Sequence, residues 1–253
     1  MESFTETKDT IHGMRLPAAA TVRRAGILLE ETMSAPTASI RSFFLDGPAG
    51  HLEALLNQGA AGATHAALVC HPHPVFGGTL HNKVVFHAMK AMNSLGLPVL
   101  RFNFRGTGLS EGKHDHGRGE VDDVRAALDW LESEFGLPLI FAGFSFGAAV
   151  GLAAACPDLR VRACISLGLP LAMVEDRVYD FGLLHTCHKP KLFVSGDHDQ
   201  YGPRAALESL FESLPEPKKL VRMPGADHFF NGHLREMRET VEAWVGELLT
   251  ARS

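Results

Sequence analysis

The sequence is poor in cysteine, with only four cysteines among 253 residues and none in a C-x-x-C pair. Two of them, Cys70 and Cys164, lie within apolar runs, which is typical of buried free thiols. So few cysteines with no paired spacing argue against a disulfide framework and favour a reducing compartment.

Long apolar runs and basic clusters are also missing. No apolar stretch approaches the ~18 residues that a membrane helix needs, and the start of the chain, MESFTETKDT, lacks the apolar core of a secretory signal. The net charge of -5 and the absence of a basic run with interleaved aromatics give no sign of nucleic-acid binding. We therefore expect a cytoplasmic protein with no membrane or nucleic-acid partner, and the sequence leaves a homodimer open.

The first part of the chain differs in pattern from the rest. Residues 1–38 are polar and show no sustained periodicity, so we interpret them as an N-terminal extension. Two short strand patterns, at residues 39–45 and 51–56, flank the turn-rich segment DGPAG. This arrangement predicts an antiparallel hairpin at the start of the ordered domain.

Strand and helix patterns then alternate to the C-terminus. Residues 66–70 form a short apolar run, and residues 119–136 carry apolar side chains at spacings of three and four. Further strands are expected at residues 98–104, 138–144, 161–168, 191–196 and 219–225. The alternation predicts an α/β domain over residues 39–253, with a mostly parallel eight-stranded sheet and helices on both faces. Functional residues are then expected in the loops beyond the carboxyl ends of the strands.

A G-x-S-x-G motif spans Gly143 to Gly147 between a predicted strand and a helix rich in alanine and glycine. This setting is typical of a nucleophile elbow, in which a tight turn exposes the serine hydroxyl. The residues two before and two after the serine must be small, because larger side chains would collide. Ser145 is therefore the candidate nucleophile.

A serine nucleophile needs a base and a carboxylate that orients the base. His228 follows the last predicted strand, and the loop DHDQYGP after an earlier strand offers Asp197 and Asp199. We predict Asp199 as the orienting acid, because a strand-end residue such as Asp197 tends to shape the turn. The chain order Ser, Asp, His is that of α/β-hydrolases.

Five segments carry a resemblance to a known family: HPHPVFGGT, RFNFRGTGLSEG, AGFSFGAAV, SGDHDQYGP and PGADHFFNG. From about Ser39 onward the chain resembles an α/β-hydrolase. It is most similar to small bacterial hydrolases of the dienelactone-hydrolase-like and serine-aminopeptidase-type esterase group. The resemblance implies the α/β-hydrolase fold and an esterase-like triad. In that family the acid follows the strand-end glycine by three positions, which leads from Gly196 to Asp199.

Acyl transfer also needs two N–H donors for the developing oxyanion. One is expected from the amide of Phe146, directly after the nucleophile. The second is expected from HPHPVFGG, where the two prolines have no N–H and limit the donors near the strand end to His71, His73 and Val75. In the related folds the donor follows a His-Gly pair, and this resemblance implies the amide of His73.

The sequence of these loops also allows two other interpretations. His71 and His73 are two residues apart and could chelate a metal, but no third ligand pattern accompanies them, so we predict no metal and no cofactor. RFNFRGTGLSEG lacks the lysine and hydroxyl residue of a phosphate loop. Within it, Arg105 is a candidate contact for a carboxylate substrate.

The connection at residues 169–190 is too short for a cap domain, although a helix or two would fit, centred on residues 174–184. A shallow site follows, and the candidate substrate-binding residues are Phe76, Phe144, Tyr201 and Phe229. The expected activity is cleavage of small-molecule carboxylic esters of small to medium acyl chain through an acyl-enzyme. A thioesterase, lactonase or peptidase with the same triad, or a non-catalytic binding protein, remains open.

Overall fold

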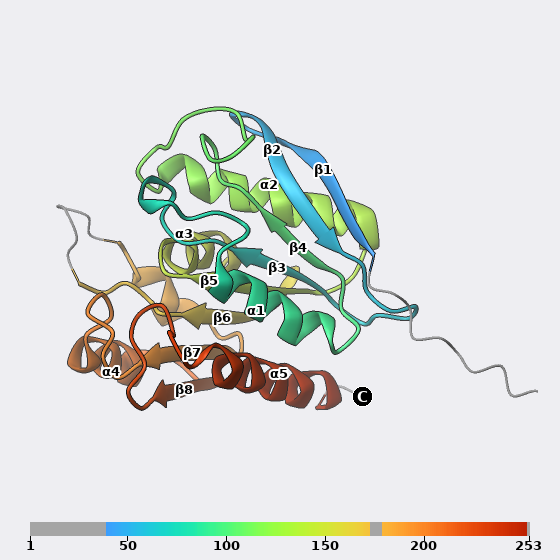
Figure 1. Cartoon of the computed structure of the whole chain (residues 1–253). Helices are drawn as coiled ribbons and strands as arrows, with labels where there is room; N and C mark the ends of the chain where they lie inside the picture. Colours follow the sequence, from blue (N-terminus) through green and yellow to red (C-terminus); the bar gives the residue numbers. More distant parts are fainter. Residues whose placement is uncertain (1–38, 173–178, 252–253) are drawn as a thin grey trace, which may run out of the picture. The chain divides into compact units, whose positions relative to one another are not determined.

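The structure is a computed structural model that describes residues 39–172 and 179–251. It contains one eight-stranded sheet of order β1-β2-β4-β3-β5-β6-β7-β8 (Figure 1). The predicted extension at residues 1–38 lies outside the described residues, as do residues 173–178 of the connection after β6.

The sheet begins with an antiparallel hairpin. Strand β1 (Ile40–Gly47) pairs with β2 (Gly50–Asn57), and Gly47 faces Gly50 across the turn. The hairpin predicted from the DGPAG segment is therefore confirmed. Strand β2 also runs antiparallel to β4, and every later pair in the sheet is parallel.

The parallel part of the sheet accounts for the apolar runs in the sequence. Strands β3, β4, β5 and β7 are buried along their whole length, because helices cover both faces. The bounds of the parallel strands are Ala66–Cys70 for β3, Val99–Phe102 for β4, Leu139–Phe144 for β5, Val161–Leu167 for β6, Lys191–Gly196 for β7 and Lys218–Met223 for β8.

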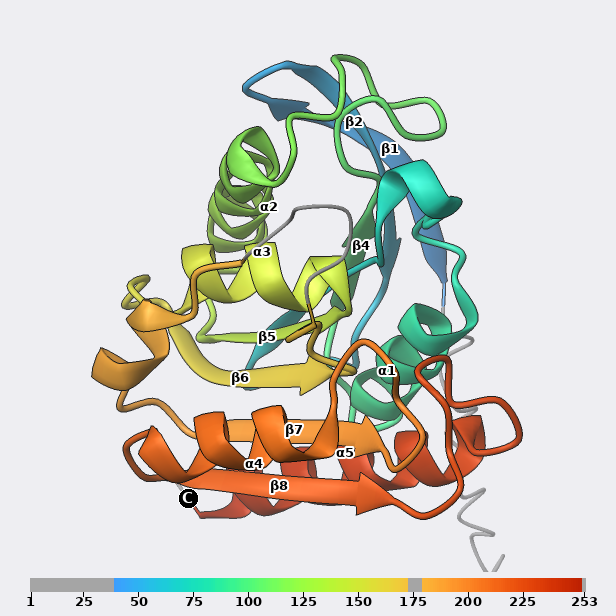
Figure 2. The ribbon, with the colours of Figure 1, turned by 90° about the vertical axis from the view of Figure 1, so that its left-hand side faces the viewer.

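Five α-helices lie on the two faces of the sheet (Figure 2). Helices α1 (Lys83–Asn93) and α5 (Leu234–Thr250) share one hydrophobic cluster with the sheet. Helices α2 (Arg118–Phe135), α3 (Phe146–Ala155) and α4 (Arg204–Ser213) contribute to the cluster on the opposite face. This layered arrangement confirms the predicted α/β-hydrolase fold.

Two short 3₁₀ helices complete the described elements, η1 (Pro74–Phe76) and η2 (Gly182–Thr186). Between β6 and β7 the described residues hold only η2, so no cap domain is present in that part of the connection. The rest of the helical segment predicted at residues 174–184 falls mainly outside the described residues. Within the described ranges, no helix combines the length and the apolar character required to cross a membrane.

Candidate active site

Ser145 lies in the tight turn between β5 and α3. Its backbone has φ 54° and ψ −119°, a strained conformation for a residue with a Cβ atom. A Cβ added at Gly143 would lie 2.5 Å from the Gly147 carbonyl oxygen, and one added at Gly147 would lie 2.4 Å from the carbonyl oxygen of His71. Both flanking glycines are therefore required by close backbone contacts, as the motif predicts.

A continuous hydrogen-bonded chain joins three of the predicted residues. The His228 Nε2 atom lies 2.9 Å from the Ser145 hydroxyl oxygen, and its Nδ1 atom lies 2.9 Å from each carboxylate oxygen of Asp199. The Asp199 side chain is fully buried and accepts hydrogen bonds from the amides of Tyr201 and Gly202, at 2.8 and 2.9 Å. These amides fix the carboxylate in the orientation that holds the imidazole.

The neighbouring acid, Asp197, lies in a different environment. It forms an ion pair with Arg222, whose other guanidinium nitrogen lies 3.0 Å from Glu208. Of the two acids in the loop after β7, Asp199 is therefore the one that contacts His228.

Three aromatic rings pack against the imidazole of His228. The ring centroids of Tyr201, Phe144 and Phe229 lie 4.6, 5.1 and 5.2 Å from that of His228. A Cβ added at Gly168 would lie 3.2 Å from the same imidazole. The packing leaves His228 little freedom to rotate away from Ser145.

One predicted substrate contact is wrong. Phe144 is fully buried and packs against His228, and it is not among the residues that line the cavity above Ser145. Strand β5 is buried on both faces, so its apolar sequence pattern could not show which way Phe144 points.

A cavity of about 150 Å³ opens above Ser145, Phe146 and His228. Its other lining residues include three of the predicted substrate contacts, Phe76, Tyr201 and Phe229. Sequence reasoning missed Asn82, Pro170 and Tyr179, which also line it. Pro170 and Tyr179 belong to the irregular connection after β6, where no periodic pattern assigns a direction to a side chain.

The loop HPHPVFGG folds back on itself beside the cavity. Gly77 ends η1 with φ 79°, and a Cβ added at Gly78 would lie only 2.1 Å from the Pro72 carbonyl oxygen. The carbonyl of His73 accepts hydrogen bonds from the amides of Phe76 and Gly78, at 3.2 and 3.0 Å. The first glycine therefore supplies the turn, and the second allows the close backbone approach.

His73 lies directly against the helix that begins after the nucleophile. Its ring centroid is 4.7 Å from that of Phe146, and its Nδ1 atom accepts a hydrogen bond of 3.2 Å from the Val75 amide. The two residues predicted to donate oxyanion hydrogen bonds, His73 and Phe146, are thus in side-chain contact and both line the cavity.

His71 has a different role from His73. It is fully buried; its Nδ1 atom lies 2.7 Å from the Pro72 carbonyl oxygen, and its Nε2 atom lies 3.0 Å from the Phe104 amide. Since a carbonyl only accepts and an amide N–H only donates, Nδ1 carries the proton and Nε2 accepts. Burial lowers the pKa of His71 to about 4, so the ring stays neutral. Both nitrogens of His71 and Nδ1 of His73 thus bind separate main-chain groups.

Arg105 is held away from the cavity. Its guanidinium forms a two-point ion pair with Asp123, with distances of 2.7 Å from Nη2 and 3.0 Å from Nε, and the Asp123 side chain is fully buried. Arg105 does not line the cavity, so the suggestion that it binds a carboxylate substrate is wrong. The arginine instead ties the loop after β4 to α2.

The sequence matches the alpha/beta hydrolase domain family over residues 69–249. The chain therefore belongs to that family. A relative from Rickettsia prowazekii, the uncharacterized protein RP471, is 32% identical over 209 residues, which cover 80% of this chain and 87% of the relative.

Solved structures of other proteins are also similar to this chain, and two of them show this by sequence identity and superposition. An alpha-beta serine hydrolase homologue from Coxiella burnetii is 36% identical and superposes with a TM-score of 0.74, covering 80% of this chain and 96% of that one. XC6422 from Xanthomonas campestris, described as a member of the serine hydrolases without a lid, is 35% identical with a TM-score of 0.73. That superposition covers 85% of this chain and 96% of XC6422. The family and these neighbours identify the chain as a hydrolase of the α/β fold.

Proposed function

We propose that the protein is a serine hydrolase that cleaves carboxylic esters through an acyl-enzyme formed on Ser145. The observation that carries the proposal is the unbroken hydrogen-bonded chain from the Ser145 hydroxyl through His228 to the buried carboxylate of Asp199. A serine hydroxyl is a weak nucleophile alone, and this arrangement is the one that activates it.

The reaction runs in two stages. His228 Nε2 takes the hydroxyl proton as the Ser145 oxygen attacks the ester carbonyl, and the same nitrogen then gives that proton to the departing alcohol. A water molecule, deprotonated by His228, next attacks the acyl-enzyme, and His228 returns this proton to the Ser145 oxygen as the acid departs. Asp199 keeps Nδ1 protonated and stabilises the imidazolium formed in each stage.

The developing negative charge on the carbonyl oxygen needs donors that are already in place. We assign these to the amides of Phe146 and His73. Phe146 is the first residue of α3, where the helix dipole also favours negative charge. His73 is held by the hydrogen bonds of its own carbonyl and by its contact with the Phe146 ring.

The cavity supports an acyl group of small to medium size. It is lined largely by apolar and aromatic side chains, and two of these lie at the surface: Phe76 is 59% exposed and Phe229 is 44% exposed. An acyl chain can therefore lie between these rings without displacing buried residues. A cytoplasmic ester of low molecular mass fits this proposal.

The test is hydrolysis of p-nitrophenyl esters of graded acyl length by the wild type and by Ser145→Ala. We expect the highest kcat/KM with short to medium acyl chains and a loss of at least ~10³-fold in kcat for the variant, the scale of a missing triad member. An equal rate in the variant would exclude the mechanism. Higher kcat/KM with matched thioesters, lactones or amides would keep the triad but move the activity to that class.

A further inference from the structure

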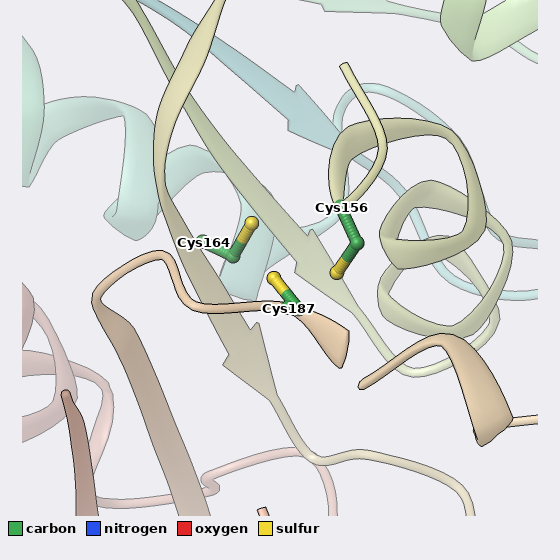
Figure 3. A group of neighbouring side chains, drawn as sticks. All are labelled: Cys156, Cys164 and Cys187. Atoms are coloured by element: carbon green, nitrogen blue, oxygen red, sulfur yellow. The ribbon is translucent and has the colours of Figure 1, made fainter. Parts of the chain in front are cut away.

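Three cysteines on separate elements converge in the interior. Cys156 directly follows α3, Cys164 lies in β6 and Cys187 directly follows η2. All three are buried, and their sulfur atoms lie within 4.8 Å of one another. Figure 3 shows the thiol groups pointing toward one another from these separate elements.

The spacing of the sulfurs suits a single metal ion. Thiolates bind metals at about 2.3 Å, so three sulfurs in a plane around one ion lie about 4 Å apart. The cluster needs to close by less than about 1 Å to reach that arrangement. A disulfide would use only two of the three sulfurs and would leave the third without a role.

Positive charge accompanies the three thiols. Lys191 is only 1% exposed, and its ammonium donates hydrogen bonds to the Cys187 and Lys189 carbonyls, at 2.6 and 2.9 Å. The Lys189 ammonium in turn donates to the carbonyl of Ala155, the residue before Cys156, at 2.7 Å. These hydrogen bonds place the two lysine side chains beside the segments that carry Cys187 and Cys156.

We propose that Cys156, Cys164 and Cys187 bind one copper(I) ion as three thiolates. Soft thiolate ligands select soft cations such as copper(I). Three thiolates and one monovalent ion leave a net charge of -2, which the two lysine ammoniums offset. Zinc prefers four ligands, and in the described part of the chain no fourth histidine, cysteine or acidic side chain joins the group.

The sulfur cluster is separate from the candidate active site. Helix α3 begins directly after Ser145 and ends at Ala155, the residue before Cys156, and its ten residues span about 15 Å. The two sites therefore lie at opposite ends of one helix, and metal binding can be measured independently of ester hydrolysis.

The experiment titrates the reduced full-length protein with copper(I) under anaerobic conditions against a chromogenic copper(I) chelator. We expect one copper ion per chain, with a near-ultraviolet thiolate-to-copper absorption band. Cys156→Ser and Cys187→Ser should each weaken binding by at least ~100-fold, since even the loss of an outer-shell partner costs 10–100-fold. Lys191→Met, which removes the ammonium and its hydrogen bonds to the Cys187 and Lys189 carbonyls, should weaken it by about tenfold.

Cys70→Ala is the matched control, because Cys70 is also buried but lies in β3 outside the cluster. It should bind one copper ion as tightly as the wild type, and thermal melting of every variant checks that it is folded. Unchanged binding in both cluster variants, or a loss in the folded Cys70→Ala protein, would overturn the proposal. So would zinc bound more tightly than copper(I) at the same stoichiometry.

Discussion

The amide of Phe104 donates a hydrogen bond of 3.0 Å to Nε2 of His71. This bond joins the loop after β4 to the loop after β3. It also requires that Nε2 has no proton, so the connection exists only while the imidazole is neutral. The histidine next to the proposed oxyanion loop therefore acts as a pH-dependent cross-link between two loops.

Acidification should weaken the fold through His71. Its pKa is about 4 in the folded chain, against 6.5 as the ordinary value, so the unfolded chain binds the proton more readily. The stabilisation is complete above pH 6.5 and is lost as the pH falls toward 4. At pH 5 the loss is about 2 kcal/mol. Urea unfolding at pH 7.5 and 5 should show this extra decrease in the wild type but not in His71→Gln. Equal decreases in both proteins would contradict the assignment.

The two acids of the loop after β7 should differ sharply in their effect on catalysis. Asp199→Asn leaves the ring of His228 without the carboxylate that fixes its tautomer, and kcat should fall about 10³–10⁴-fold. Asp197→Asn removes only an ion pair with Arg222, and kcat should stay within about threefold of wild type. Initial rates on one p-nitrophenyl ester decide the point, and a larger loss for Asp197→Asn would reverse the assignment.

Alanine substitutions at the adjacent glycines Gly77 and Gly78, in the loop after β3, should differ in their effect on kcat. Gly78→Ala places a Cβ 2.1 Å from the Pro72 carbonyl oxygen and must displace the backbone around His73. We expect a loss of at least ~10² in kcat, as when an oxyanion donor is removed. Gly77→Ala meets no atom within 4 Å and carries only the strain of φ 79°, about 1–2 kcal/mol of stability. Its kcat should fall less than about tenfold; similar losses in the two variants would argue against a fixed His73 amide.

The amide of His73 can be removed separately from its side chain. His73 has φ −54° and ψ 121°, which proline can adopt, so His73→Pro deletes the N–H with little change of backbone. His73→Ala deletes the imidazole and keeps the N–H. We expect His73→Pro to have a kcat about 10²-fold below that of His73→Ala, with similar melting temperatures. Equal kcat values would move the second oxyanion donor to another residue.

Local patterns in the sequence were sufficient to predict the elements of the fold and the residues around Ser145. The strand before Ser145, the small residues around it and the turn at DGPAG each act over a few positions, and the structure has them where the sequence predicts. The selection of Asp199 over Asp197 depended on the family resemblance as well as on the turn.

Features that depend on tertiary contacts could not be predicted from the sequence. The packing of Phe144 against His228 cannot be predicted from a strand that is apolar on both faces. The cross-link from His71 to Phe104 appears only when two loops meet. Cys156, Cys164 and Cys187 have no ligand spacing that a motif search detects, because a helix, a strand and a loop bring them together.

Ser145 occupies the N-cap position of α3, yet its side chain makes no capping hydrogen bond. A serine at this position usually stabilises a helix by about 0.5–2 kcal/mol by accepting a bond from the first turn. Here the hydroxyl is directed to His228, and the residue also carries the strain of a positive φ. Ser145→Gly, which relieves that strain, should therefore melt at a higher temperature than the wild type. The nucleophile is a local weak point in the thermodynamic stability of the protein that contains it.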